Sequence, residues 1–147
     1  MKKLWVLLTL VCSSEALSHG LDSFQRDDFL RVYSSVGISD ECPLDQDVFW
    51  RLLNKEIRSK GIQLVEFDSA EATLFLRIEC FENTDPKGFL FYTSLMLAWI
   101  QGELVPELDL RDYYGYRETS SEVAEDSHRV IQEGVARYLE LSTGGDF

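Results

Sequence analysis

The chain has 147 residues, 45% hydrophobic and 12% aromatic, which is enough apolar material for one core. Its 26 acidic and 14 basic side chains give a formal net charge of -12, so its surface repels phosphate groups. The composition excludes a disordered chain, and the charge makes nucleic acid and anionic membranes poor partners.

Residues 1–18 have the organisation of a secretory signal peptide, with cleavage expected after Ser18 or, as the alternative, after Ala16. Its three parts are a positive start, an apolar run and a small, polar end: residues 1–3, 4–11 and 13–18. The apolar run is far shorter than the roughly 20 residues that a membrane span requires. The sequence therefore predicts a periplasmic or secreted protein.

Cys12 allows a second interpretation, because bacterial lipoproteins are cleaved just before a cysteine that then carries lipid. That cleavage requires a small residue before the cysteine, and Val11 is branched. Contact with the membrane is expected only if Cys12 is lipidated.

Cys42 and Cys80 are the two cysteines outside the predicted signal peptide. In an exported chain such a pair predicts one disulfide. The alternative is that Cys80 is a small buried hydrophobe and Cys42 a free thiol. A bridge would close a loop of about 38 residues, which stabilises a fold by on the order of 3–4 kcal/mol.

We expect residues 19–28 to be a flexible lead-in, residues 29–142 to form a single domain and residues 143–147 to be a tail. Residues 29–36 alternate and are rich in β-branched and aromatic side chains, which predicts a first strand. Residues 37–43 form its connection to a helix.

Residues 44–60 predict the first helix, with Asp45 at its positive end and Gly61 as the residue that stops it. Trp50 lies at the edge of the apolar stripe, where it would cover the seam between helix and sheet. The stripe itself comprises Val48, Phe49, Leu52, Leu53 and Ile57.

Residues 62–67 predict a short strand, and residues 72–104 predict a long hairpin around which the chain is organised. In its first arm one side of the alternation is wholly apolar. The turn formers lie at residues 83–88. The second arm, residues 89–100, is apolar at nearly every position, which predicts a central strand covered on both faces.

Residues 108–118 predict a weak, glycine-bearing strand at a sheet edge. Tyr113, Tyr114 and Tyr116 place aromatic rings on both of its faces, and tyrosine suits partly wet interfaces. These three residues are the candidate partner-binding site. The alternative is that they close the sheet against the following helix.

Thr119 and Glu122 match a capping box, which predicts that the second helix begins there. Gly134 lies within its apolar face and costs about 1 kcal/mol of helix propensity. We expect close approach of the helix backbone to the sheet or to the first helix as the compensation.

No catalytic, metal or cofactor site is predicted. His128 is the one histidine away from the cleavage site, and it lies at the boundary between the two faces of the second helix. The sequence contains no paired Cys-x-x-Cys, no His-Glu-x-x-His and no phosphate-binding glycine loop.

The predicted fold class is α+β: a four- or five-stranded, mainly antiparallel sheet with two helices packed on one face, in the order β-α-β-β-β-α. The pattern resembles the small periplasmic α+β domains of bacterial envelope-assembly and transport-accessory lipoproteins, of the lipopolysaccharide-assembly or curli-secretion type. The resembling segments are residues 29–36, the step 60–62, the alternations Ala70, Ala72, Leu74, Leu76 and Tyr92, Ser94, Met96, and the closing helix. The resemblance implies a noncatalytic accessory role and carries over no binding residue.

Three functions follow from these patterns. The first is a noncatalytic exported domain that binds another envelope protein. The second is a carrier of a small molecule or lipid, with a pocket between sheet and helices lined by aromatics: Phe75, Phe81, Phe89, Phe91 and Trp99. The third and weakest is a hydrolase that uses carboxylates.

Overall fold

The computed structural model describes residues 31–84, 87–99 and 108–143. The side chains of Ala98 and Trp99 are outside that description. The predicted signal peptide, its cleavage site, Cys12 and His19 lie outside the described residues.

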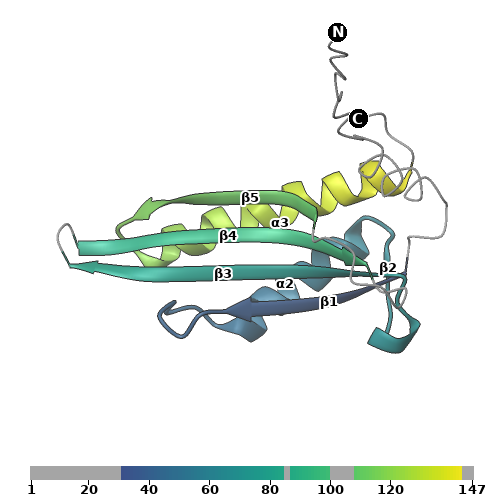
Figure 1. The fold of residues 1–147 in the computed structure, drawn as a ribbon, viewed down its shortest axis with the longest axis horizontal. Helices are drawn as coiled ribbons and strands as arrows, with labels where there is room; N and C mark the ends of the chain where they lie inside the picture. The colour runs from purple at the N-terminus through teal and green to yellow at the C-terminus, as the bar shows by residue number, and fades with distance from the viewer. Residues whose placement is uncertain (1–30, 85–86, 100–107, 144–147) are drawn as a thin grey trace, which may run out of the picture.

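In the described part of the chain, five strands form one mixed sheet, and both α-helices lie on the same side of it (Figure 1). The sheet order is β2-β1-β3-β4-β5. The strands are β1 (Arg31–Ile38), β2 (Gln63–Leu64), β3 (Ala72–Thr84), β4 (Lys87–Trp99) and β5 (Leu108–Arg117). The helices are α2 (Gln46–Ser59), α3 (Ser120–Ser142) and the short 3-10 helix η1 (Phe67–Ser69). The predicted α+β class is confirmed, and the longer ladders, β3–β4 and β4–β5, are antiparallel.

The β3–β4 hairpin is the centre of the sheet, as predicted. Its pairing runs from Ala72 opposite Trp99 to Thr84 opposite Lys87. The strands therefore continue into the predicted turn at residues 83–88 and leave only residues 85 and 86 between them. Long pairing satisfies the backbone groups of both arms, which is why the turn is tighter than its turn-forming residues suggested.

Strand β1 lies parallel to β3 and extends to Ile38, two residues beyond the predicted end. Gly37 fits in the strand because it has no side chain and leaves room for the ring of Phe75. A Cβ at this position would be 3.0 Å from Cζ of that ring. The prediction that the connection begins at Gly37 was wrong for this reason.

Helix α2 starts two residues after the predicted start at residue 44 and ends one residue before the predicted end at residue 60. The side chain of Asp45 accepts hydrogen bonds from the backbone N–H groups of Asp47 (2.8 Å) and Val48 (3.3 Å). Gly61 has a φ of 78°, in the left-handed region that favours glycine. The helix is therefore bounded by local sequence at both ends.

The buried side of α2 differs from the predicted stripe at three positions. Phe49, Leu53 and Ile57 are buried, but Val48 is exposed, Leu52 is half-buried and Asn54 is buried. The buried stripe is therefore rotated about the helix axis toward Asn54, because α2 packs over β1 and β2 and against α3.

The predicted strand at residues 62–67 is confirmed only at Gln63–Leu64. After Val65 donates its N–H to the carbonyl of Val32, at 2.9 Å, the chain turns into η1. The ring of Phe67 then lies edge-on to that of Tyr33, with centroids 5.4 Å apart. This contact replaces further pairing with β1.

Helix α3 begins with the predicted capping box at Thr119 and Glu122. Its apolar side packs on β4 and β5, and a Cβ at Gly134 would lie 2.7 Å from Cδ2 of Leu95. The predicted close approach of α3 to the sheet at Gly134 is confirmed. Asp126 of α3 is buried although it is charged.

The predicted disulfide joins Cys42 and Cys80, with an S–S distance of 2.10 Å and a Cα–Cα distance of 5.0 Å. It ties the connection between β1 and α2 to the central strand β3. Both cysteines belong to the buried core.

Candidate functional site

Among the described strands, β5 pairs with β4 alone, because it is the last strand in the sheet order. The predicted edge position is therefore confirmed. Its three tyrosines point to opposite sides of the sheet: Tyr113 pairs with Thr93 on the helix side, whereas Tyr114 and Tyr116 pair with Tyr92 and Leu90 on the other side.

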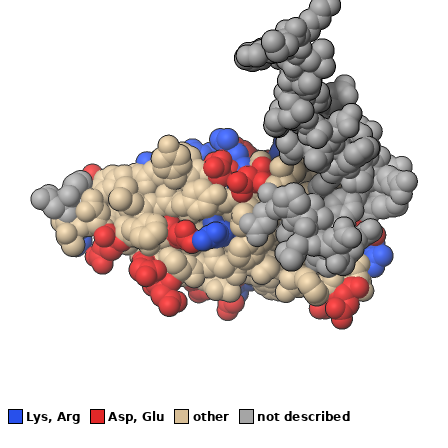
Figure 2. Space-filling model, in the orientation of Figure 1, with Lys and Arg blue, Asp and Glu red and all other residues tan. Residues whose placement is uncertain are grey.

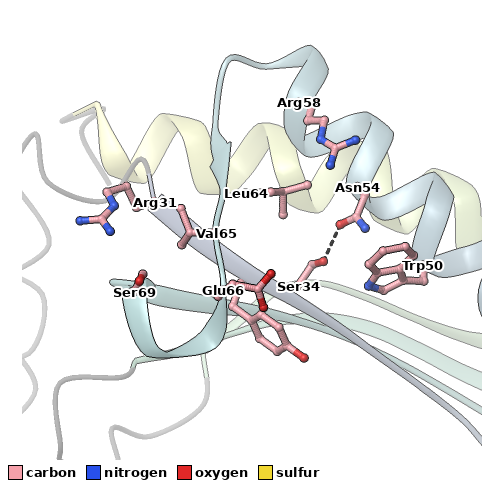
Figure 3. A pocket seen from close by; sticks show the side chains of 10 residues that line it. Arg31, Ser34, Trp50, Asn54, Arg58, Leu64, Val65, Glu66 and Ser69 are labelled. Atoms are coloured by element: carbon pink, nitrogen blue, oxygen red, sulfur yellow. Dashed lines mark hydrogen bonds between the residues drawn. The ribbon is translucent and has the colours of Figure 1, made fainter.

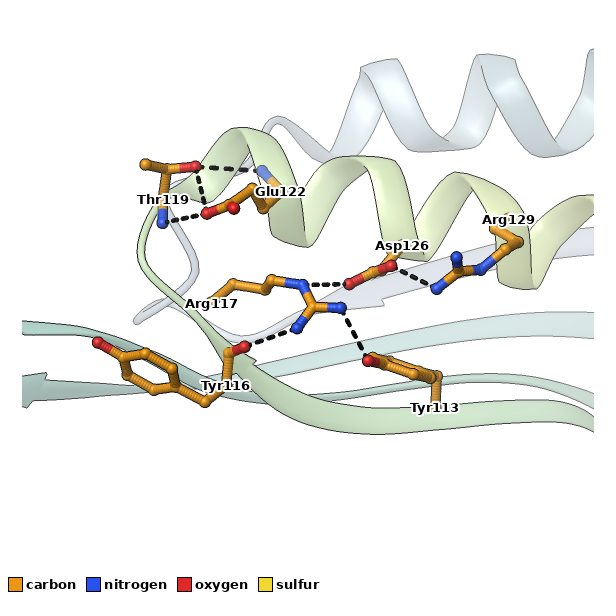
Figure 4. Close-up of polar contacts among 7 residues, drawn as sticks. All are labelled: Tyr113, Tyr116, Arg117, Thr119, Glu122, Asp126 and Arg129. Atoms are coloured by element: carbon orange, nitrogen blue, oxygen red, sulfur yellow. Dashed lines mark hydrogen bonds and ion pairs between the residues drawn. The ribbon is translucent and has the colours of Figure 1, made fainter.

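Tyr113 is part of the contact between β5 and α3 (Figure 4). Its ring lies 5.6 Å from that of the buried Phe91, and its hydroxyl accepts a 2.8 Å hydrogen bond from Nη2 of Arg117. Arg129 and Arg117 stand near the ring, with Cζ atoms 5.5 and 5.6 Å from its centroid. These contacts hold the sheet against the helix, as the alternative interpretation of the tyrosines stated.

Asp126 connects the two arginines of this cluster. Its carboxylate forms an ion pair of 2.7 Å with Nε of Arg117 and another with Arg129. Desolvation lowers the pKa of Arg117, but the hydrogen bond and charge of Asp126 outweigh it and the pKa is raised. The cluster is therefore a charged connection between the end of β5 and the first half of α3.

Tyr114 and Tyr116 belong to the side of the sheet opposite the helices. On this side, cross-strand pairing forms two neighbouring rows, Tyr116-Leu90-Phe81 and Tyr114-Tyr92-Glu79. Tyr114 is 79% exposed, Phe81 60% and Leu90 50%. We call Phe81, Leu90, Tyr92, Tyr114 and Tyr116 the aromatic sheet face.

Exposure of Leu90 also corrects the prediction that the second hairpin arm is covered on both faces. Phe91, Leu95 and Leu97 are buried on the helix side, but no described helix covers the other side at the hairpin end. A broad area of uncharged side chains lies there, with acidic side chains along its margin (Figure 2).

The aromatic sheet face has a fixed part and a free part. The hydroxyl of Tyr116 donates a 2.6 Å hydrogen bond to the carbonyl of Lys87, and a Cβ at Gly88 would be 2.5 Å from that hydroxyl. Tyr116 is therefore held across the glycine, whereas Tyr114 projects into solvent.

Polar side chains border the aromatic sheet face toward the middle of the sheet. Arg77 forms an ion pair with Glu79, and the hydroxyl of Ser94 donates a 2.8 Å hydrogen bond to Asp109. An exposed apolar centre with a hydrogen-bonded polar border has the composition of a protein contact surface.

The aromatics predicted to line a carrier pocket do not share one side of the sheet. Phe91 is buried and Phe89 packs against the core on the helix side, whereas Phe81 is exposed on the opposite side. Phe75 pairs with Met96 on that same opposite side. These rings are divided by the sheet and form no common pocket.

Except for Asp126, the acidic side chains of the described residues are exposed or half-buried. Asp126 is the buried carboxylate among them, and it is neutralised by two arginines. His128, at the predicted boundary of α3, is half-buried. Within residues 31–84, 87–99 and 108–143, no three His, Cys, Asp or Glu side chains are grouped to hold a metal ion.

No helix in the described part of the chain is both long and apolar enough to span a bilayer.

The sequence matches no protein family and no curated protein. Among solved structures, the fold is similar to the PelC dodecamer from Paraburkholderia phytofirmans, with 14% identity over 74% of this chain and 88% of that chain and a TM-score of 0.45. It is also similar to a minor lipoprotein from Acinetobacter baumannii, with 13% identity over 79% of this chain and 94% of that chain and a TM-score of 0.41. With TM-scores below 0.5, these likenesses assign no function to this chain.

Proposed function

We propose that the chain is a noncatalytic, exported domain of the cell envelope that binds another protein through the aromatic sheet face and the free edge of β5. The observation that carries this proposal is Tyr114, a 79% exposed aromatic on an edge strand, next to exposed Leu90 and Phe81. Burial of such side chains is the main favourable term in protein association.

The free edge of β5 adds a second means of recognition. An edge strand presents unpaired N–H and C=O groups, which a partner strand can use for pairing. In this arrangement Tyr114 is the apolar anchor and its hydroxyl retains a hydrogen bond at the rim of the contact.

The disulfide supports the exported location. Bridges form and persist in oxidising compartments, and Cys42 and Cys80 are joined in this fold. The segment predicted as a signal peptide agrees with this location.

Photo-cross-linking in the native envelope tests the proposal. A benzophenone amino acid placed at position 114 is expected to cross-link to a discrete protein, because its side chain projects from β5. The matched control is the same amino acid at Gln132, an exposed position of α3 on the helix side of the sheet.

The affinity for the captured protein then shows whether the side chain of Tyr114 contributes to binding. Tyr114→Ala is expected to weaken binding by more than about 1 kcal/mol, roughly fivefold, while the circular dichroism spectrum stays unchanged. An equal loss in Gln132→Ala, or full affinity in Tyr114→Ala, would show that the aromatic sheet face is not the contact surface.

A further inference from the structure

The edge of the sheet opposite β5 is also open over most of its length. Strand β2 pairs with β1 only at Arg31 and Val32, and the next hydrogen bond, from Val65 to the carbonyl of Val32, ends the contact. Backbone groups alternate in direction along a strand, so those of residues 34, 36 and 38 point the same way as those of Val32. No strand among the described residues pairs with them there.

A groove follows this open edge, between β1 and α2. Two hollows of about 500 and 380 Å³ share Tyr33, Ser34 and Trp50 in their lining, so they form one continuous depression. Figure 3 shows the larger part, with Trp50 and Asn54 reaching toward β1 from α2. We call this depression the β1 groove.

The base and the wall of the β1 groove have different chemistry. At the base, the buried hydroxyl of Ser34 donates a hydrogen bond to Oδ1 of the buried Asn54. On the wall, the ring of Trp50 is 47% exposed, although it sits beside the core-facing stripe of α2. The groove therefore combines a backbone edge with an accessible aromatic ring.

Cations gather on the α2 side of the groove. Arg51, Lys55 and Arg58 are exposed and form no ion pair with a described residue, whereas Arg31 and Lys60 nearby are paired with Glu71 and Glu56. A third hollow, of about 260 Å³, is lined by these three cations together with Trp50 and Asn54.

This charge is opposite to that of the whole chain, which carries a formal net charge of -12. Glu66 and Asp47 also line the groove, and Asp47 belongs to the first turn of α2, so the positive side is the later part of that helix, from Arg51 to Arg58. A negatively charged ligand is repelled by the rest of the surface and attracted here.

We propose that the β1 groove binds an extended, acidic peptide segment of a partner protein. The segment adds a strand to residues 34–38 through backbone hydrogen bonds. On the α2 side, one apolar side chain packs on Trp50, and carboxylates meet Arg58 and the adjacent cations. The five residues of the open edge accommodate a segment of roughly 15 Å.

Fluorescence anisotropy with a defined probe tests this proposal on the mature protein. The probe is a fluorescein-labelled peptide of about seven residues that alternates valine and glutamate, long enough to cover the open edge. Two matched peptides replace glutamate with lysine, which reverses the charge, or the central valine with proline, which removes a backbone donor. Only the valine–glutamate peptide is expected to bind, and its affinity falls as salt is raised.

Variants assign the binding to the groove. Trp50→Ala and Arg58→Glu are each expected to weaken the valine–glutamate peptide at least about tenfold. Lys87→Glu has the same charge change at the far end of the β3–β4 hairpin and is expected to leave the affinity unchanged. All three side chains are exposed, and circular dichroism verifies that the variants are folded.

Several results would overturn the proposal. They are the absence of binding, equal binding of the lysine or proline peptide, an equal loss in the Lys87→Glu control, and displacement of the peptide by succinate, which would indicate a small-anion site. Self-association of the unliganded protein in sedimentation experiments, abolished by Arg58→Glu, would instead place a second copy in the groove. None of these results depends on Tyr114, so they are separate from the test of the aromatic sheet face.

Discussion

At the residue scale, local chemistry decides where α3 begins and how closely it approaches the sheet. Glu122 accepts a hydrogen bond from the backbone N–H of Thr119 at 3.0 Å, and the Thr119 hydroxyl accepts one from the N–H of Glu122 at 3.3 Å. Gly134 then brings the helix backbone against Leu95. Both features were predicted from single residues and their neighbours in sequence.

Gly134→Ala tests the contact between α3 and β4. The added methyl group favours the helix by about 1 kcal/mol, but it would lie 2.7 Å from Cδ2 and 3.0 Å from Cβ of the fully buried Leu95. The clash is expected to prevail and to lower the free energy of unfolding by about 1–3 kcal/mol, measured by urea denaturation.

Two controls accompany this variant. Gln132→Ala, at an exposed position of the same helix, is expected to change stability by less than about 0.5 kcal/mol. Combination with Leu95→Ala is expected to cost less than the sum of the two single changes, because the methyl group then occupies vacated space. Strict additivity would contradict a direct contact.

The capping box predicts a pH-dependent contribution to stability. The side-chain and backbone hydrogen bonds of Thr119 lower the pKa of Glu122 below its ordinary value of 4.5. A carboxylate with a lowered pKa in the folded state stabilises the fold above the unfolded value, and this contribution is lost as the pH falls through the lowered pKa.

Thermal unfolding of Glu122→Gln and of the parent chain measures this contribution. The parent is expected to be more stable at pH 7, and the difference is expected to shrink as the pH falls below about 4.5. Thr119→Ala is expected to cost about 1 kcal/mol at pH 7. A constant difference between parent and Glu122→Gln from pH 7 to pH 3 would contradict the pKa shift.

At the scale of elements, the charged cluster of Arg117, Asp126 and Arg129 joins the edge strand β5 to α3. Each of the described elements α3, β4 and β5 contacts the other two, so this corner of the fold is packed as a unit. Because Tyr113 is part of this unit, removal of all three tyrosines would disturb the fold as well as the exposed surface. Tyr114 alone separates binding from stability.

Asp126→Asn tests how strongly this cluster holds β5 to α3. The change leaves two arginines close together without their carboxylate, so we expect a loss of about 1–3 kcal/mol in the free energy of unfolding. Glu133→Gln removes the exposed partner of Arg111 from the same pair of elements and is expected to cost less than about 1 kcal/mol. If the two variants lose equal stability, burial of Asp126 has no energetic role.

At the scale of the whole molecule, the disulfide joins the loop between β1 and α2 to the central strand β3. Its two cysteines are 38 residues apart in sequence. It restricts the unfolded chain across the region that contains α2, β2 and η1. The two proposed contact surfaces lie at opposite edges of the sheet that this bridge stabilises.

Removal of the bridge in Cys42→Ser with Cys80→Ser is expected to lower the free energy of unfolding by on the order of 3–4 kcal/mol, with an added cost for two buried hydroxyl groups. We expect a thiol titration of the parent chain, isolated from its envelope and unfolded without reductant, to detect no free thiol. Two titratable thiols in that unreduced sample would show that the bridge is absent in the exported protein.

The sequence by itself determined those features that depend on neighbouring residues: the α+β class, the hairpin, the edge position of β5, the capping box of α3, the stop of α2 at Gly61 and the close approach at Gly134. Tertiary structure alone decided that β2 is limited to Gln63–Leu64, which side of α2 is buried, and that Asp126 is buried between two arginines. It also decided which tyrosines of β5 are free and that an open edge beside β1 faces Trp50 and three unpaired cations. Periodicity reports which residues share a face, but it does not reveal whether another element covers that face, because coverage depends on segments distant in sequence.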